Sequence, residues 1–283
     1  MSRSAGLMGG KWRSVFQDRG AALGIGIVLL IVLAAIFASV ISPFDPFEQN
    51  TAMRLRPPSW DHWLGTDQFG RDVFSRIIYG SRISLYVGIS AVIIGGVIGT
   101  AIGLAAGYFR GWFDNLVGWF TDVMMSFPTE VLAIIVIVGL GASSTTAVIA
   151  IGVVFISRYI RLIRAATLAT TGHAYIEAAK VVGQSHTIIM VRHILPNILG
   201  DTIIMTSLWV ATAIRVEAVL GFLGLGAQPP QPSWGVMIKD GLDTLLFAPW
   251  LAIVPGMAIF ITVLGFNLLG DSFRDYIDPK LQR

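Results

Sequence analysis

Apolar residues fill six long stretches of this chain, and shorter polar segments separate them. Each stretch reaches about 20 residues, the length that an α-helix needs to cross the hydrocarbon core of a bilayer. The pattern therefore predicts an all-α integral membrane protein with both termini on one side. Its six transmembrane helices are expected over residues 21–41, 83–109, 115–140, 145–163, 197–223 and 248–269.

The first apolar run is longer than the core of a secretory signal peptide, which has about 7–15 apolar residues. It is therefore expected to be an uncleaved anchor helix.

Composition agrees with a membrane protein: 54% of residues are hydrophobic and 13% are charged, against about 25% charged in soluble domains. Mean hydropathy is +0.73. No dense Lys/Arg face with interleaved aromatic residues indicates a nucleic-acid partner. The chain has no cysteine, which excludes disulfides and thiolate metal sites.

The distribution of basic residues predicts the orientation, because loops on the cytoplasmic side carry the excess of Lys and Arg. With the N-terminus inside, the inner segments hold Arg3, Lys11, Arg13, Arg19, Arg110, Arg158, Arg161, Arg164, Lys180, Arg192, Arg274, Lys280 and Arg283. The outer segments hold Arg54, Arg56, Arg71, Arg76, Arg82 and Lys239, and acidic residues accompany most of these. Both termini are therefore expected in the cytoplasm.

This orientation divides the chain into five parts. They are a cytoplasmic segment 1–20, the first transmembrane helix 21–41, a periplasmic segment 42–82, a five-helix core 83–271 with a cytoplasmic loop 165–196, and a cytoplasmic tail 272–283.

The second half of the periplasmic segment has the pattern of a helix lying in the membrane interface. Asp67 is expected to cap it, and Phe69, Val73 and Ile77 share one face. Asp67–Arg71 and Asp72–Arg76 are spaced as i,i+4 ion pairs. A solvated charged helix and a functional contact remain equally open.

Small residues recur every four positions in the second transmembrane helix, at Ala91, Gly95, Gly99, Gly103 and Gly107. In a membrane such a stripe lets another helix approach closely. The partner is expected to be a helix of this chain, with a partner subunit as the alternative.

The polar loop 165–196 contains a helix-forming island between apolar runs. Glu177 lies early in the first loop helix, where a carboxylate suits the helix dipole, and Ala178 and Ala179 give it a flat surface. Gly183 is expected to end this helix in a left-handed conformation, and Ser185 to cap a second one. Pro196 fits the first turn of the following transmembrane helix. On these grounds alone a docking surface and an ordinary amphipathic loop are both open.

This loop resembles the "EAA" loop of ABC-importer permeases. Glu177, Ala178, Ala179 and Gly183 match the motif, and His193 stands where the family has an apolar residue, two before the Leu of a Leu-Pro pair. Further segments resemble the second, C-type permease of the dipeptide, oligopeptide and nickel branch: 62–67, 70–72, 75–76, 127–128, 221–226, 228–230, 266–271, 274–275 and 278–279.

The resemblance implies a type I ABC-importer permease fold with cytoplasmic coupling helices, in a bacterial inner membrane. It implies a heterodimer with a sister permease, one or two ATPase subunits that bind ATP and Mg, and a periplasmic solute-binding protein. The ATPase-coupling residues would be Tyr175, Glu177, Ala178, Ala179, Gly183, His193 and Pro196. The expected cargo is a di- or oligopeptide, with nickel, glutathione and opines as alternatives. Gln228 and Trp234 are expected to contact the binding protein or form part of an outer gate.

Ionisable residues inside predicted spans are costly there and are functional candidates by default. Asp122 and Glu130 flank Phe127–Pro128 of the third span, and Arg215 and Glu217 lie on the fifth. They are expected either to line the pathway or to pair within the bundle. Asp122 is one partner proposed for Arg215, and extension to an interface is the alternative.

No catalytic motif is present. No Lys is followed by Ser or Thr, so the chain lacks the Gly-rich phosphate loop of an ATPase. His186 and His193 share a helix face without the Cys or paired carboxylates of a metal site. The chain is therefore expected to be a non-catalytic subunit without a cofactor of its own. An ion-driven secondary transporter and a membrane scaffold are the rival classes.

Overall fold

The computed structural model describes residues 19–277, and every regular element in that range is a helix. The predicted cytoplasmic segment before Arg19 and the tail beyond Ile277 lie outside the described residues. Five helical stretches are long and apolar enough to cross a membrane. They are α2 (Arg19–Ile36), α4 (Val73–Phe109), α7 (Ser144–Thr171), the stretch His186–Phe222 that ends in α10 (Leu195–Phe222), and α12 (Trp250–Ile277).

The third predicted span, residues 115–140, is a bent pair of helices. α5 (Gly111–Ser126) and α6 (Thr129–Leu140) meet at 96°. Pro128 has no N–H to continue a helix, and the residue before a proline is driven to an extended conformation, as Phe127 is (φ −93°, ψ 142°). The helix is therefore interrupted between Ser126 and Thr129.

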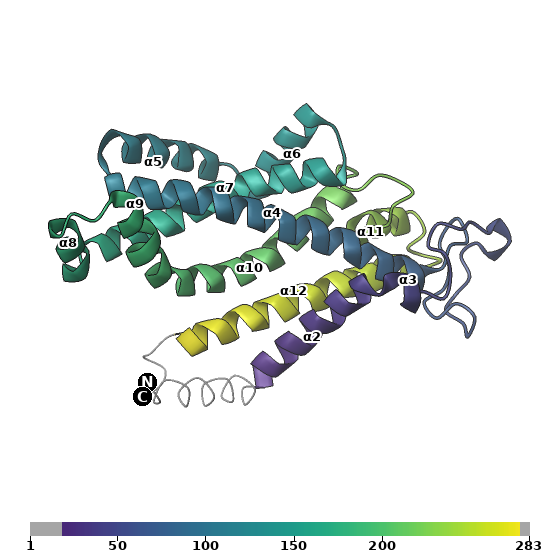
Figure 1. The fold of residues 1–283 in the computed structure, drawn as a ribbon. Coiled ribbons are helices and arrows are strands. Elements are labelled where there is room, and N and C mark those ends of the chain that lie inside the picture. The colour runs from purple at the N-terminus through teal and green to yellow at the C-terminus, as the bar shows by residue number, and fades with distance from the viewer. Residues whose placement is uncertain (1–18, 278–283) are drawn as a thin grey trace.

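The long helices run side by side and the short elements gather at the two ends (Figure 1). One end carries α8 (Ala174–Val181) and α9 (His186–Ile188). The other carries α3 (Ala38–Ile41), the 3₁₀ turn Thr51–Met53 and α11 (Trp234–Leu242). The first turn of α2 and the last turn of α12 lie toward the end with α8, in agreement with the prediction that both termini are on one side of the membrane. We call that end the inner end and the opposite end the outer end.

The small-residue stripe of α4 packs on α7 of the same chain. A Cβ added at Gly99 would lie 2.5 Å from the Cβ of Tyr159 and 2.7 Å from the carbonyl oxygen of Ile156. A Cβ added at Gly103 would lie 2.9 Å from its nearest α7 atom, and one added at Gly107 would lie 2.8 Å from its nearest α7 atom. The prediction that the stripe serves the chain's own bundle is confirmed.

The outer end differs from the prediction of an interfacial helix beginning near Asp67. α4 begins at Val73, and the Asp72 carboxylate caps it by accepting the N–H of Ser75. Because Asp72 also bonds His62 Nδ1 at 2.9 Å, it forms no ion pair with Arg76, contrary to the i,i+4 prediction. The other predicted pair is formed, with Arg71 Nε 2.6 Å from Asp67 Oδ2.

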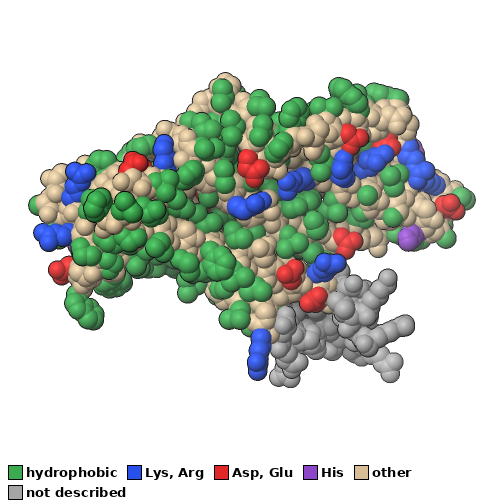
Figure 2. Space-filling view, turned by 180° about the vertical axis from the view of Figure 1, so that it is seen from behind, with side chains coloured by type: hydrophobic (Ala, Val, Ile, Leu, Met, Phe, Trp, Pro, Cys, Tyr) green, Lys and Arg blue, Asp and Glu red, His purple; other side chains and the backbone are tan. Residues whose placement is uncertain are grey.

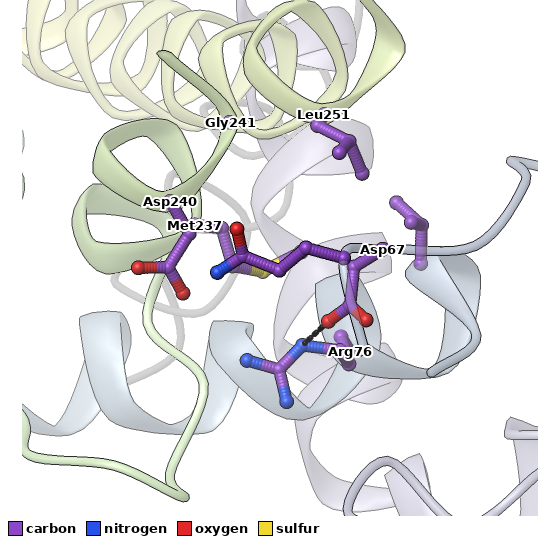
Figure 3. A pocket seen from close by; sticks show the side chains of 8 residues that line it. Asp67, Arg76, Met237, Asp240, Gly241 and Leu251 are labelled. Atoms are coloured by element: carbon purple, nitrogen blue, oxygen red, sulfur yellow. Dashed lines mark ion pairs between the residues drawn. The ribbon is translucent and has the colours of Figure 1, made fainter. Parts of the chain in front are cut away.

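Asp67 instead organises a buried ionic cluster. Its side chain contacts Arg71 at 2.6 Å and Arg76 at 3.4 Å, and all three residues are almost fully buried. Figure 3 shows Asp67 and Arg76 beside Asp240 of α11, around a cavity of about 20 Å³ that has room for roughly one water molecule. Burial raises the pKa of the Asp240 carboxyl, while Arg76 and Arg71 oppose that rise. The cluster therefore ties segment 42–72 to α4 and α11.

We expect Asp67→Asn to destabilise the outer end, because it leaves Arg71 and Arg76 buried without their common counter-ion. Breaking a buried pair in this way costs about 3–5 kcal/mol. The thermal midpoint of the purified protein in detergent measures the effect. Asp61→Asn, the same change at an exposed site of the same segment, is the control. Equal midpoints for the two variants would contradict the cluster's stabilising role.

Candidate functional site

The inner end presents a short helix, α8, whose C-terminus is fixed by its own backbone. The N–H of Gln184 bonds the carbonyl of Ala179 at 3.1 Å, and the N–H of Gly183 bonds that of Lys180 at 3.0 Å. These two bonds form a Schellman motif, which requires a left-handed residue after the cap. Gly183 supplies it with φ +79°. The predicted left-handed conformation of Gly183 at the end of this helix is confirmed.

One face of α8 is anchored on the transmembrane helices. Ile176 is fully buried and Ala179 is 7% exposed, and both belong to an apolar cluster. The other buried members come from α4, α7, the π-helical stretch that follows α9, and α10: Leu104, Ile163, Ile189, Ile194 and Ile198. A force on α8 therefore reaches several long helices through close-packed side chains.

The opposite face of α8 is exposed and mostly apolar. Val181 is 86% exposed and Val182 is 78% exposed, and Glu177 is the one acidic residue of the helix. We call this exposed set the α8 surface: Tyr175, Glu177, Ala178, Val181 and Val182. Val181 and Val182 were not predicted as site residues, although two adjacent β-branched residues in a polar loop were a visible signal. Ala179, predicted to help form the flat surface, faces inward instead.

The second predicted loop helix is not separate from the fifth span. Ser185 caps α9 by accepting the N–H of Ile188, as predicted. A π-helical stretch, Ile189–Ile194, then leads directly into α10. Pro196 lies in the first turn of α10 and has no N–H for the carbonyl of Arg192, which accounts for a widened turn at this place. Such π segments occur often at functional sites.

The two histidines of this loop bond to different partners. His193 Nε2 lies 2.7 Å from Gln184 Oε1, and His186 Nδ1 lies 2.8 Å from the Tyr108 hydroxyl of α4. Lys180 lies over the Tyr108 ring at 5.5 Å. The loop is thus held to the end of α4 by polar contacts in addition to its apolar base.

Figure 2, which views the molecule from the side opposite to Figure 1, shows basic and acidic side chains running across a face that is rich in hydrophobic side chains. On α7, Arg158, Arg161 and Arg164 are spaced at i, i+3 and i+6 and share a face. We call the following set the charged band: Asp114, Asp122, Glu130, Arg158, Arg161, Arg164 and Arg215.

Two acid–base pairs hold the inner half of this band. Arg161 contacts Asp122 at 2.5 Å, and Arg164 binds Asp114 through two nitrogens. The predicted pairing of Arg215 with Asp122 is therefore wrong, because Arg161 on the adjacent helix takes that carboxylate. Arg161, Arg164 and Asp114 were not predicted as site residues. Two sequence patterns could have indicated them: the three-residue spacing of Arg158, Arg161 and Arg164, and the eight-residue spacing of Asp114 and Asp122.

The outer half of the band lies at the α5–α6 bend. Arg158 donates to Thr129 Oγ1 at 2.6 Å and lies over the Phe155 ring at 5.2 Å. Both Glu130 and Arg215 act electrostatically on its guanidinium. Among the described residues, Arg215 has no ion-pair partner.

The remaining predicted site residues of the outer half lie elsewhere. Glu217 is 1% exposed and accepts a hydrogen bond from Ser84 of α4 at 2.8 Å, so it lies between helices and not in the charged band. Trp234 is 2% exposed, and its Nε1 donates to the carbonyl of Ile77, which anchors α11 on α4. Gln228 is exposed and bonds the backbone of Gly224 and Gly226.

An all-helical membrane bundle with charged side chains on one face and a short exposed helix at its inner end is the arrangement of a transport permease. Comparison with known proteins agrees. Residues 99–283 match the family described as "Binding-protein-dependent transport system inner membrane component", and residues 7–58 match "N-terminal TM domain of oligopeptide transport permease C".

Similar proteins include the dipeptide transport system permease protein DppC of Alkalihalophilus pseudofirmus, 42% identical over 96% of this chain and 90% of that protein. The glutathione transport system permease protein GsiD of Escherichia coli O157:H7 shows the same identity and coverage. The fold resembles the MetNI methionine ABC transporter in inward-facing conformations (TM-score 0.60, 18% identity, 72% of this chain and 97% of that chain).

The chain belongs to the binding-protein-dependent inner membrane permeases of ABC importers. It is a multi-spanning, non-catalytic inner membrane subunit of C type. The resemblance found in its sequence motifs is confirmed.

Proposed function

We propose that this chain forms half of the pathway of an importer for di- or oligopeptides, glutathione included, together with a sister permease. ATPase subunits, which bind ATP and Mg, dock on the α8 surface, and a periplasmic binding protein delivers cargo at the outer end. The observation that carries the proposal is the two-sided character of α8. Its apolar base is buried among four helical elements, while its opposite face is exposed. The names of the dipeptide and glutathione relatives support the cargo class.

The proposed mechanism transfers conformational work. Closure of the ATPases on ATP moves the α8 surface, and the cluster beneath it moves with α8 because a packed core transmits displacement. The attached helices α4, α7 and α10 then tilt as nearly rigid bodies, a known mode of switching. The close fit of the α4 glycines on α7 supports joint movement of these two helices.

The charged band is proposed to face the pathway. Exposed charges at membrane depth avoid lipid and face a bundle interior or water-filled cavity. Asp122 and Arg161 are paired with each other, and both side chains are exposed on this chain. A water-filled pathway shared with the sister permease satisfies them. Gln228 remains a proposed contact for the binding protein, because its side chain is exposed near the outer end. Trp234 is proposed to support that region from within.

Reconstitution in vesicles tests the function. We expect uptake of alanyl-alanine or glutathione to require internal ATP, the ATPase subunits and the binding protein. Uptake driven by an ion gradient without the ATPases would favour a secondary transporter and reject the proposal. Cells lacking the chain provide a second test: if they retain binding-protein-dependent uptake, the chain is a scaffold and not half of the pathway.

A further inference from the structure

The ratio of arginines to acids differs between the inner and outer halves of the charged band. Toward the inner end, Arg164 and Arg161 each meet a carboxylate, Asp114 and Asp122. At the α5–α6 bend, Arg158 lies within electrostatic reach of one acid, Glu130, and of a second arginine, Arg215. The outer half of the band therefore has an excess of one positive charge among the described residues.

Within residues 19–277, neither of the two outer arginines forms a close ion pair. Arg158 is half-buried, and its hydrogen-bond partner is the neutral hydroxyl of Thr129. Arg215 projects from α10 and is exposed. The two guanidinium groups come from different helices, α7 and α10, yet lie close enough to repel each other. Keeping like charges together at membrane depth is costly, and such residues mark functional sites by default.

An anionic ligand would relieve this repulsion. A guanidinium presents a planar fork of N–H donors that matches the two oxygens of a carboxylate, and Arg is the usual residue where this group is recognised. A bare divalent cation would meet net repulsion at the same point. The arrangement therefore favours a carboxylate-bearing solute over a free metal ion.

We propose that Arg158 and Arg215 form the point at which the pathway attracts the carboxylate of its cargo. The inference rests on the proposed function and deepens it, because it selects solutes with a free carboxylate, such as peptides and glutathione, over bare nickel. Arg158 is the fixed member, held by Thr129 and the Phe155 ring. Arg215 is the exposed member.

The absence of cysteine permits a direct test of the local charge. Val219 lies one turn from Arg215 on α10 and is exposed. In the assembled importer, Val219→Cys is treated with anionic and with cationic methanethiosulfonate reagents. The ratio of the two rates is normalised to that of Leu246→Cys, which lies in an exposed outer loop. We expect a normalised anionic preference of at least about five-fold.

A second substitution, added to Val219→Cys, tests whether Arg158 and Arg215 cause the preference for the anionic reagent. Arg215→Gln and Arg158→Gln should each lower it at least two-fold, while Arg54→Gln, the loss of an exposed outer arginine, should leave it unchanged. A ratio that does not respond to Arg215→Gln overturns the proposal. So does a Val219→Cys variant that reacts with neither reagent, because position 219 would then be covered by protein or lipid.

Transport provides the second readout. Arg215→Gln and Arg158→Gln should lower uptake of alanyl-alanine and glutathione at least ten-fold, while ATP hydrolysis stimulated by the binding protein stays within two-fold of wild type. Arg215→Lys should keep more uptake than Arg215→Gln. Wild-type uptake in both Gln variants overturns the inference. A wild-type importer that takes up neither probe instead refutes the proposed function, and the labelling ratio still reports on the charge.

Discussion

Glu177→Lys and Gly183→Glu should each reduce uptake at least ten-fold in the reconstituted importer while leaving the chain folded. Glu177 is the acidic residue of the α8 surface, so a lysine reverses its local charge at the proposed ATPase contact. A Cβ at Gly183 would meet nothing within 4 Å in this chain. A side chain there would therefore extend into open space beside the surface on which the ATPase is proposed to dock. The φ of +79° adds strain of about 1–2 kcal/mol to that variant.

The measurement compares uptake with ATP hydrolysis stimulated by the binding protein. We expect uptake to fall and stimulation to be lost, with the thermal midpoint within a few degrees of wild type. Gly183→Ala distinguishes the effect of backbone strain from the effect of side-chain size, because alanine has the same positive φ as glutamate but adds only a methyl group. Asp275→Lys, an exposed acid on α12 toward the same end of the bundle, controls for charge. Wild-type uptake and stimulation in both test variants would remove α8 from the coupling path.

Features that depend on neighbouring residues could be predicted from the sequence. The left-handed conformation of Gly183, the cap at Ser185 and the place of Pro196 follow from contacts within a few positions. The glycine stripe of α4 is also a local pattern, since a period of four residues identifies one helix face. The family motifs add the order of these features along the chain.

Pairings between distant residues could not be predicted, because a periodic pattern gives the face of a helix and not its neighbour. Asp122 pairs with Arg161, which is 39 positions away, and Ser84 bonds Glu217 across 133 positions. Trp234 was proposed as an outer contact because it lies in a polar segment, but its ring fills the space beside Gly80 of α4. The interfacial helix predicted to begin near Asp67 is instead the first part of α4, which begins at Val73, and the Asp72 side chain that caps it also bonds His62 of the preceding loop.

The contact between α4 and α7 is where a small change should disrupt the whole bundle. The two helices meet through glycines, so their separation is set by backbone atoms and not by side chains that can rotate away. Because α4 also contributes Arg76 to the buried ionic cluster at the outer end and Tyr108 to the contacts of loop 165–196, displacing it disturbs both ends of the bundle.

Gly99→Leu should therefore prevent stable accumulation of the chain in the membrane, and Gly99→Ala should already lower the thermal midpoint. Even the alanine Cβ would lie 2.7 Å from a backbone carbonyl oxygen of α7, which only a shift of the helix can relieve. Overpacking of this kind costs about 1–3 kcal/mol, and leucine adds three carbons more. Gly139→Ala, in a helix where a Cβ meets nothing within 4 Å, should leave the midpoint unchanged or raise it slightly. If Gly99→Ala and Gly139→Ala melt alike in detergent, α4 and α7 are not held at the separation described, and a rigid transfer of force from α8 through this pair is untenable.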